Sequence, residues 1–248
     1  MNIFFRRLSV ALTLALTLGS AFAADTKLDK NIDAKIGNVS IAIPVPQAYV
    51  DSSLMFPKVL QLGETMTASA NRLLAFFISD DDVKALLSQT APTLQRYMMV
   101  QTLRAAEDSS MGAQDFKEVR NQLKNQYKQF IADSKERMQS EVDQAVERLS
   151  KESSQPKNVS MKLGELKVIE VMEDEKFVTL ITKTLVGANV NGELKEIPMV
   201  MGLGTTMVKG KIVYFFCYAR LNSDADVAWI KSQNAMWMPS LFAANSTQ

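Results

Sequence analysis

Carboxylates are the side chains of this sequence that could act as general acids or bases, because the chain contains no histidine. Catalysis by Ser-His-Asp or Cys-His groups is therefore excluded, and so is zinc binding through imidazole. A glycosidase requires two carboxyl groups that face each other across a cleft. The acidic residues considered for such a pair lie beside a predicted strand or before a predicted helix: Glu165, Glu170, Glu173, Asp224 and Asp226. A carboxylate-dependent hydrolase is therefore one alternative.

Two groups of residues could bind a metal ion. Asp80, Asp81 and Asp82 offer oxygen ligands, but calcium loops space their ligands and turn at a glycine. Consecutive acids before an apolar run are typical of a helix N-terminus, so we interpret them as a cap. Methionine is abundant, and Met199 and Met201 share one strand face. Thioethers bind Cu(I), yet without a Met-x-x-Met cluster they are typical core fillers. We predict no metal site and no cofactor.

One observation in each case argues against a phosphate-binding loop, a reactive cysteine and nucleic-acid binding. The run Gly202-Leu-Gly-Thr-Thr206 lacks the lysine and the following helix of a phosphate-binding loop, so its glycines predict close packing of another element. Cys217 is the only cysteine and lies in an apolar strand, which favours a buried, inert thiol over a reactive or intermolecular one. With 28 basic and 27 acidic side chains, the chain lacks the charge excess of a nucleic-acid-binding protein.

One strand presents aromatic side chains on a single face. Tyr214, Phe216 and Tyr218 alternate with Phe215 and Cys217, so the two sets point to opposite sides of the strand. If no helix covers the three aromatic residues, they form a surface for a ligand or partner. If a helix covers them, they belong to the core.

A long amphipathic helix is predicted over residues 111–153. Phe116, Tyr127, Met138 and Leu149 are each 11 residues apart, a repeat that keeps them on one face of a straight helix. At about 60 Å, such a helix must either break near Asp133-Ser134 or project from the body. We expect it to dock a protein partner or a second copy of itself. The candidate contact residues are Phe116, Tyr127 and Phe130.

The remaining elements must position these side chains. Strands are predicted near residues 38–43, 72–78, 95–104, 166–172, 177–186, 197–208 and 211–221, and short loops join the late ones into an antiparallel meander. Helices are predicted near 56–65, 83–87 and 227–237. The fold class is therefore α+β, an antiparallel sheet with helices on its faces and the long helical insertion.

The segment Val39-Ser-Ile-Ala-Ile-Pro-Val-Pro-Gln-Ala-Tyr-Val-Asp-Ser-Ser53 resembles the entry of PsbP-like proteins, where a strand that ends in prolines leads into an aspartate-hydroxyl turn. The resemblance covers these residues only. It implies a sheet with helices on both faces and a binding or assembly role rather than an enzymatic one. No functional residues are transferred from it.

The N-terminal residues 1–23 are typical of a cleavable secretory signal peptide. Arg6 and Arg7 precede an apolar run, and Ala21-Phe22-Ala23 fits the specificity of signal peptidase. We expect a flexible lead-in over 24–37, then one α+β domain over 38–248 that contains the insertion at 111–153. After cleavage no later segment is apolar enough to span a membrane. The expected location is the periplasm, with secretion into the medium as the alternative.

These expectations favour an exported, non-enzymatic binding or assembly protein that acts through the long helix or the aromatic strand face. The first alternative is a carrier of small molecules or lipids with a pocket between sheet and helices. The second is the carboxylate-dependent hydrolase. Nucleic acid is not an expected partner.

Overall fold

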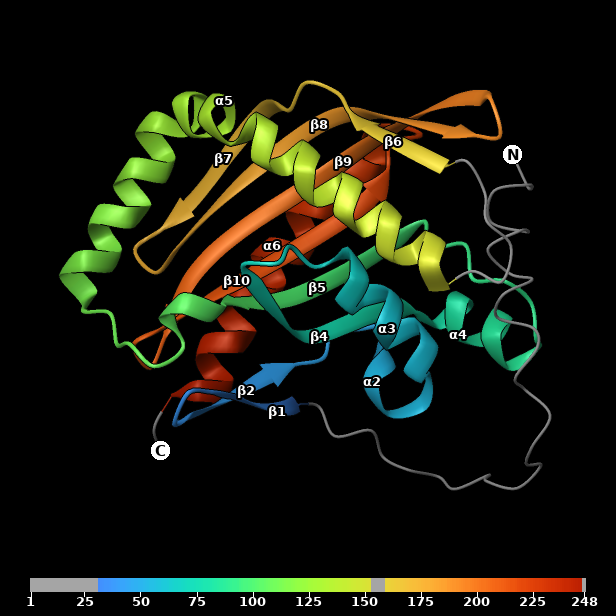
Figure 1. Cartoon of the computed structure of the whole chain (residues 1–248). Coiled ribbons are helices and arrows are strands. Elements are labelled where there is room, and N and C mark those ends of the chain that lie inside the picture. The colour runs from blue at the N-terminus through green and yellow to red at the C-terminus, as the bar shows by residue number, and fades with distance from the viewer. Residues whose placement is uncertain (1–30, 153–158, 247–248) are drawn as a thin grey trace.

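A large antiparallel sheet forms the centre of the structure, a computed structural model that describes residues 31–152 and 159–246. Its strand order is β3-β4-β5-β10-β9-β8-β6, and β7 also pairs with β8 (Figure 1). The strands are β3 (Tyr49–Asp51), β4 (Asn71–Ser79), β5 (Arg96–Leu103), β6 (Val159–Leu163), β7 (Lys167–Asp174), β8 (Phe177–Val190), β9 (Glu193–Val208) and β10 (Lys211–Arg220). The predicted α+β class is confirmed. The predicted signal peptide, residues 1–23, lies outside the described residues.

The late strands form the predicted meander because the turns between them are tight. Asn191 and Gly192 join β8 to β9, and Lys209 and Gly210 join β9 to β10, all four with positive φ. Two-residue hairpin turns of type I′ have this backbone conformation at both central positions. The strand β8 is long enough to pair with β7 along its first half and with β6 along its second. The strand β6 was not predicted.

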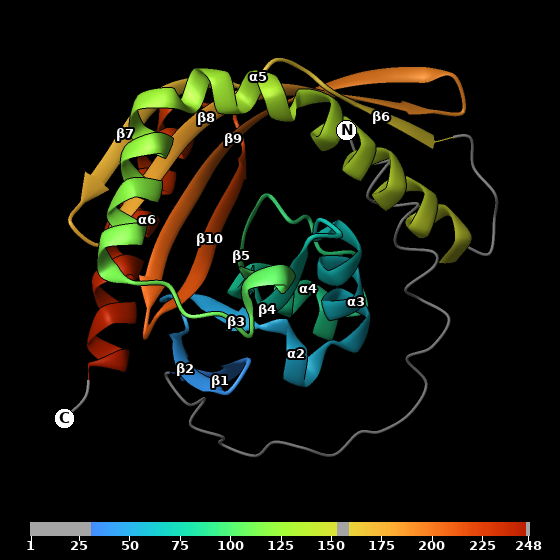
Figure 2. The ribbon, with the colours of Figure 1, turned by 60° about the vertical axis from the view of Figure 1, so that its left-hand side comes forward.

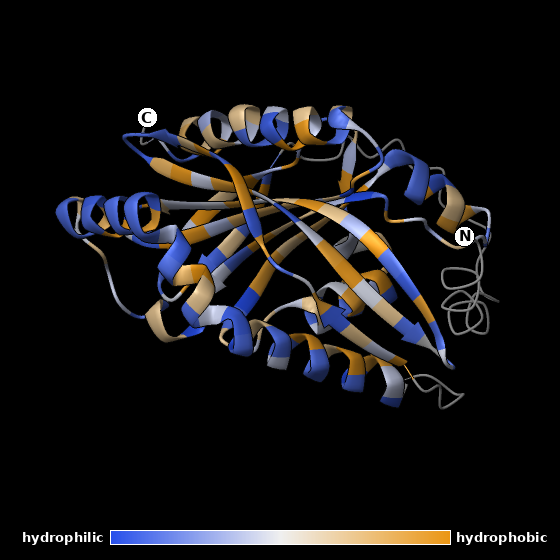
Figure 3. Ribbon diagram, turned by 90° about the horizontal axis from the view of Figure 1, so that it is seen from above, coloured by the Kyte–Doolittle hydropathy of each residue, from blue (hydrophilic) through white to orange (hydrophobic). Residues whose placement is uncertain are grey.

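Helices cover both faces of the sheet. They are α2 (Ser52–Met55), α3 (Pro57–Met66), α4 (Asp80–Leu87), α5 (Ala113–Glu152) and α6 (Asp224–Asn245), and a short 3-10 turn, η2, spans Arg104–Ala106. The helix α6 lies behind the sheet in Figure 1, whereas α3, α4 and α5 lie in front of it. Figure 3 shows the strands between these two layers from above. We call the two sides the α6 face and the α5 face.

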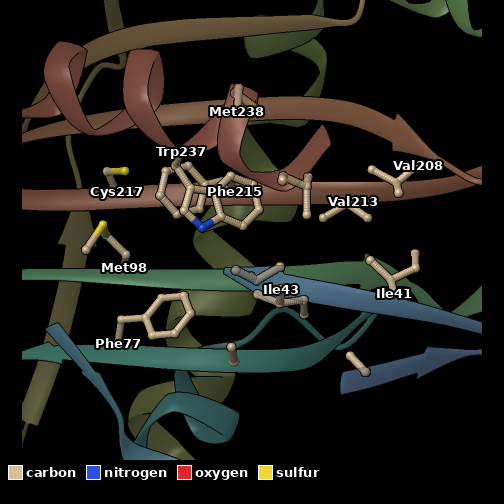
Figure 4. Close-up of a cluster of buried hydrophobic side chains, with 14 of the residues drawn as sticks. Ile41, Ile43, Phe77, Met98, Val208, Val213, Phe215, Cys217, Trp237 and Met238 are labelled. Atoms are coloured by element: carbon tan, nitrogen blue, oxygen red, sulfur yellow. The ribbon is translucent and has the colours of Figure 1, made fainter. Parts of the chain in front are cut away.

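The main core lies between the α6 face and α6. Phe215 of β10 stacks on Trp237 of α6 with ring centroids 4.0 Å apart, and Ile41 and Ile43 of β2 (Val39–Pro44) pack in the same cluster (Figure 4). Cys217 is fully buried there, as predicted, and burial raises the pKa of its thiol. A thiol kept protonated and away from solvent is a poor nucleophile.

Two glycines let α6 approach the sheet, as their spacing predicted. A Cβ atom at Gly202 would lie 2.6 Å from Nδ2 of Asn234 and 2.8 Å from Cγ2 of Ile230. A Cβ atom at Gly204 would lie 2.7 Å from Cε of Met238. These contacts are shorter than van der Waals separation, so α6 packs directly on the backbone of β9.

The N-terminal hairpin of β1 (Asn31–Ile36) and β2 (Val39–Pro44) closes the other side of this core. Trp237 donates a hydrogen bond to the carbonyl of Pro44 at 2.9 Å, and the amide of Asn245 bonds both the N–H and the carbonyl of Ala42. The flexible lead-in predicted over 24–37 is therefore wrong for residues 31–36. Their alternating apolar side chains pair with β2 and bury Ile36 completely.

The long helix follows the molecule instead of projecting from it. Gln126 has φ −121° and ψ 16°, which are not helical values, so α5 turns there rather than at the predicted Asp133-Ser134. The bend lets its two halves follow different sides of the body (Figure 2). The first half runs past the β7–β8 turn, and the second packs on β6 and α3.

The last helix begins at a charged cap whose strength depends on pH. The Asp226 carboxylate accepts hydrogen bonds from Arg96 Nη2 at 2.8 Å and from the backbone N–H groups of Asn222 and Ser223 at 2.9 and 3.0 Å. Burial by itself raises the pKa of Asp226, but these three donors outweigh it and hold the pKa below its usual value. The carboxylate therefore stabilises the fold above the unfolded-state pKa of about 3.9, and this contribution is lost as the pH falls through the lower folded value.

We expect Asp226→Asn to lower the free energy of unfolding by about 1–3 kcal/mol at pH 7, because a neutral amide replaces the bonded carboxylate. The difference from the unsubstituted chain should shrink toward zero when urea denaturation is repeated well below pH 3.9. Asp224→Asn is the control, since Asp224 is exposed in the same turn. If Asp226→Asn lowered the free energy of unfolding equally at both pH values, the ion pair would not be the cause of the lower stability.

Candidate functional site

The α5 face carries six apolar side chains that are neither fully buried nor fully exposed. We call them the central patch: Met199, Met201 and Leu203 of β9 with Tyr214, Phe216 and Tyr218 of β10. Phe216 is paired with Leu203, and Tyr218 with Met201, so the patch spans two adjacent strands. The same strands are fully buried on the α6 face at Phe215 and Val200. The two faces of one sheet are thus covered to different degrees.

Aromatic contacts order one side of the central patch. Tyr214 stacks on Phe216 at 5.8 Å between ring centroids, and Tyr218 stacks on Tyr97 of β5 at 4.8 Å. Tyr97 meets Phe76 of β4 edge to face, inside the smaller core under α3 and α4. Burial raises the pKa of the Tyr97 and Tyr218 hydroxyls, which stay protonated at physiological pH. The side of the patch toward β5 is therefore aromatic and uncharged.

The first half of α5 is held on the β7–β8 side of the patch. The Arg120 guanidinium donates to the carbonyl of Asp174, and Lys124 pairs with Glu173. Phe116 is buried at the start of the helix. These contacts tie the helix to the end of the sheet where β7 turns into β8.

The second half of α5 bridges the two sides of the patch. The Gln139 amide bonds the carbonyl of Met161 and the N–H of Leu163, both at 2.9 Å, and so occupies the edge of β6. Farther along, Glu141 accepts from the N–H and hydroxyl of Ser69 at 2.9 and 2.6 Å. Arg148 donates to the carbonyl of Thr65 at the end of α3. The helix is therefore fixed to β6 at one side of the sheet and to α3 and the turn after it at the other.

The predicted contact residues of the long helix differ in exposure. Phe116 is buried, Tyr127 is half-buried, and Phe130 is exposed over 47% of its surface. The other apolar side chains at helical spacing along α5 form a stripe with them and are half-buried: Val119, Leu123, Met138, Val142, Ala145 and Leu149. Most of this stripe is thus used inside the molecule, and Phe130 is its most accessible member.

The carboxylates considered for hydrolysis lie apart from one another. Glu170 pairs with Lys231 of α6, Glu173 with Lys124 of α5, and Asp226 caps α6. In the acidic run at Asp80–Asp82, Ser79 accepts from the Asp82 N–H, which is the predicted helix cap. No group of three or more Asp, Glu or Cys residues within the described ranges is placed to hold a metal ion. Glu170, Glu173 and Asp226 are therefore each engaged by a cation from another element, and none of these ion pairs joins two of the acids.

Two polar residues on the α5 face were not singled out from the sequence. Arg220 follows Tyr218 at strand spacing and pairs with Met199. Thr182 of β8 pairs with Met201 and is fully buried. The alternation of Tyr214, Phe216 and Tyr218 would have placed Arg220 on their face had it been followed one step further. Nothing in the sequence shows that either side chain lacks a hydrogen-bond partner.

Comparisons with known proteins leave the function to be argued from these residues. No protein-family model matches the chain, and no curated protein matches it. Among helices that the structure describes, none is long and apolar enough to cross a membrane. The crystal structure of the Saccharomyces cerevisiae Ran-binding protein Mog1p is similar at 10% sequence identity over 87% of this chain and 92% of that one, with a TM-score of 0.28. A likeness of this size carries no functional argument.

Proposed function

We propose that this chain is an exported, non-enzymatic binding protein that holds an apolar ligand against the central patch. The observation that carries the proposal is the unequal covering of the sheet. The α6 face is sealed by α6 and the β1–β2 hairpin, whereas the patch stays partly exposed although α5 is tied down on both sides of it.

Partly exposed apolar side chains gathered on one surface favour a ligand that buries them. Each Å² of apolar surface removed from water stabilises the bound state by about 25 cal/mol. A scattered exposed Leu or Met needs no explanation, whereas a contiguous apolar surface favours the binding of a ligand or partner. Stacked aromatic rings and thioethers suit a flexible hydrocarbon because they offer dispersion contacts without directional demands.

The export part of the proposal rests on the sequence. A basic start, an apolar run and Ala21-Phe22-Ala23 favour secretion to the periplasm, with release to the medium as the alternative. A carrier of apolar ligands has an evident use in such a compartment, since hydrocarbon chains cross water poorly. The PsbP-like resemblance near Val39–Ser53 agrees with a binding role and adds no residue to it.

A second candidate function is an assembly role through α5. It is favoured by Phe130, whose exposed ring lies in the middle of a helix with an otherwise charged outer surface. A single exposed aromatic residue is a small anchor compared with the central patch. We therefore rank docking of a partner or a second copy on α5 below ligand binding.

The proposal is tested by native mass spectrometry of the processed chain purified from its host without detergent. We expect a population heavier than the polypeptide by the mass of a retained apolar compound. The control is the same preparation after denaturation, extraction with solvent and refolding, which should give the polypeptide mass alone. A bare polypeptide mass in repeated native preparations would count against a resident ligand, and a doubled mass would favour self-association through α5.

A further inference from the structure

At one end of the central patch, Arg220 lacks the partners that arginines normally have. Its backbone N–H donates to Gln95, but its guanidinium makes no hydrogen bond to any residue that the structure describes. Its Nε atom is buried and without a hydrogen-bond partner. No carboxylate oxygen of the described residues lies within 4.0 Å of it. A half-buried cation in this state is poorly compensated by the protein.

The contrast with the other arginines of the sheet is clear. Arg72 of β4 pairs with Glu107 at 2.8 Å and also donates to the carbonyl of Lys35. Arg96 of β5 pairs with Asp226 and lies over the Trp229 ring. Both guanidinium groups have an acid beside them, and Arg220 does not.

A second polar group on the same face is also left without a partner. The Thr182 side chain is fully buried, and its Oγ1 atom makes no hydrogen bond to a described residue. It is paired with Met201, which in turn is paired with Tyr218, the neighbour of Arg220 on the α5 face. Buried polar groups are satisfied in most native structures, so an unpartnered one calls for an explanation such as a missing ligand.

From this placement we propose that the ligand is an anionic amphiphile, with its acidic head group at Arg220 and its hydrocarbon chain along the central patch. This inference rests on the proposed function and adds the charge of the ligand to it. An arginine fork matches a carboxylate or a phosphate with two parallel hydrogen bonds. The Thr182 hydroxyl lies on β8, two strands from Arg220, and is a second unpartnered polar group on the same face of the sheet.

The dimensions of the strand suit such a ligand. From Arg220 to Tyr214 the β10 strand advances six residues, or about 20 Å at the usual rise of a strand. An extended fatty chain that starts at Arg220 would therefore pass Tyr218 and Phe216 and end near Tyr214. A neutral chain could use the same apolar residues but would leave Arg220 without an anion, and a cationic amphiphile would meet like charge there.

The test compares amphiphiles with the same ten-carbon chain and different head groups: decanoate, decyl phosphate, decanol and decyltrimethylammonium. Affinities are measured by displacement of a fluorescent apolar probe from the delipidated chain. We expect decanoate or decyl phosphate to bind about tenfold more tightly than decanol, and the ammonium compound most weakly. Whichever anion binds more tightly identifies the head group as carboxylate or phosphate.

Arg220→Gln should bring the anions to within about twofold of decanol while leaving the affinity for decanol nearly unchanged. Arg220→Lys keeps the charge and should restore part of the preference, which a purely structural role of the side chain would not do. Lys128→Gln removes one charge from the exposed surface of α5 and serves as the matched control.

The outcomes separate the two proposals. Equal binding of all four compounds, or an unchanged preference in Arg220→Gln, would overturn the anionic ligand and leave the apolar site intact. No binding of any compound by the delipidated chain would overturn the proposed function itself. A preference for anions that Lys128→Gln abolishes and Arg220→Gln does not would place the head group elsewhere.

Discussion

Replacing Gly202 by alanine is expected to lower the free energy of unfolding by about 2–3 kcal/mol, which corresponds to a fall of several degrees in the melting temperature. The added Cβ would lie 2.6 Å from Nδ2 of Asn234. That amide has no room to withdraw, because it bonds the carbonyl of Ile230 and the sulfur of Cys217, while its oxygen accepts from Thr179. The substitution must push α6 away from the sheet.

Thermal and urea denaturation of Gly202→Ala check this prediction against Gly187→Ala. Gly187 belongs to the neighbouring strand, and a Cβ atom there meets nothing closer than 3.8 Å. Its replacement should change the stability by less than about 0.5 kcal/mol. If the two alanine variants proved equally stable, α6 would not pack on β9 as described.

Replacing Leu203 by aspartate is expected to weaken the binding of an apolar ligand by about 100-fold, or about 2.7 kcal/mol. Leu203 lies in the central patch opposite Phe216, so a ligand on the patch would have to cover the new carboxylate. Burying an unpaired charge against hydrocarbon is strongly unfavourable. Titration with a fluorescent apolar probe measures the loss.

The matched control is Leu194→Asp, the same substitution on the same strand at a side chain that is 68% exposed. It should bind the probe as the unsubstituted chain does. Leu203→Ser adds no charge and shows whether a loss of binding persists without the disturbance that a carboxylate could cause to the fold. It should still weaken binding measurably. Equal affinities for Leu203→Asp and Leu194→Asp would remove Leu203 from the site.

Much of the sheet and its helices could be predicted from the sequence because local patterns decide them. Alternation in Tyr214-Phe-Phe-Cys-Tyr218 identified a strand with two apolar faces, and the glycines at 202 and 204 predicted the close approach of another element, which is α6. The acids at Asp80–Asp82 were correctly interpreted as a cap. These features depend on neighbours within a few residues, so one sequence suffices.

The predictions that were wrong concern segments whose structure depends on residues far away in the sequence. The hairpin strand β1 was expected to be part of a flexible lead-in, because its six residues, half of them polar, become a strand only when β2 pairs with them. The course of α5 depends on contacts with residues far away in sequence, such as Arg148 with Thr65 and Gln139 with the edge of β6. The bend at Gln126 carries no proline or glycine signal in the sequence.

The candidate site also combines features that local sequence patterns predict with features that depend on long-range contacts. The aromatic residues of β10 could be named from their spacing, but whether a helix covered them could not. The missing partners of Arg220 and Thr182 are properties of the folded chain, since any of its acids might have lain beside them.

The central claim, an apolar ligand on the α5 face, is tested most directly by NMR of the chain labelled at its methionine methyl groups. Met199 and Met201 lie in the central patch, whereas Met55 and Met236 are about half-exposed elsewhere. On addition of decanoate to the delipidated chain, the account predicts saturable shifts of the Met199 and Met201 signals and unchanged signals for the other two. Shifts confined to Met55 or Met236, or no shift at any methionine, would contradict it.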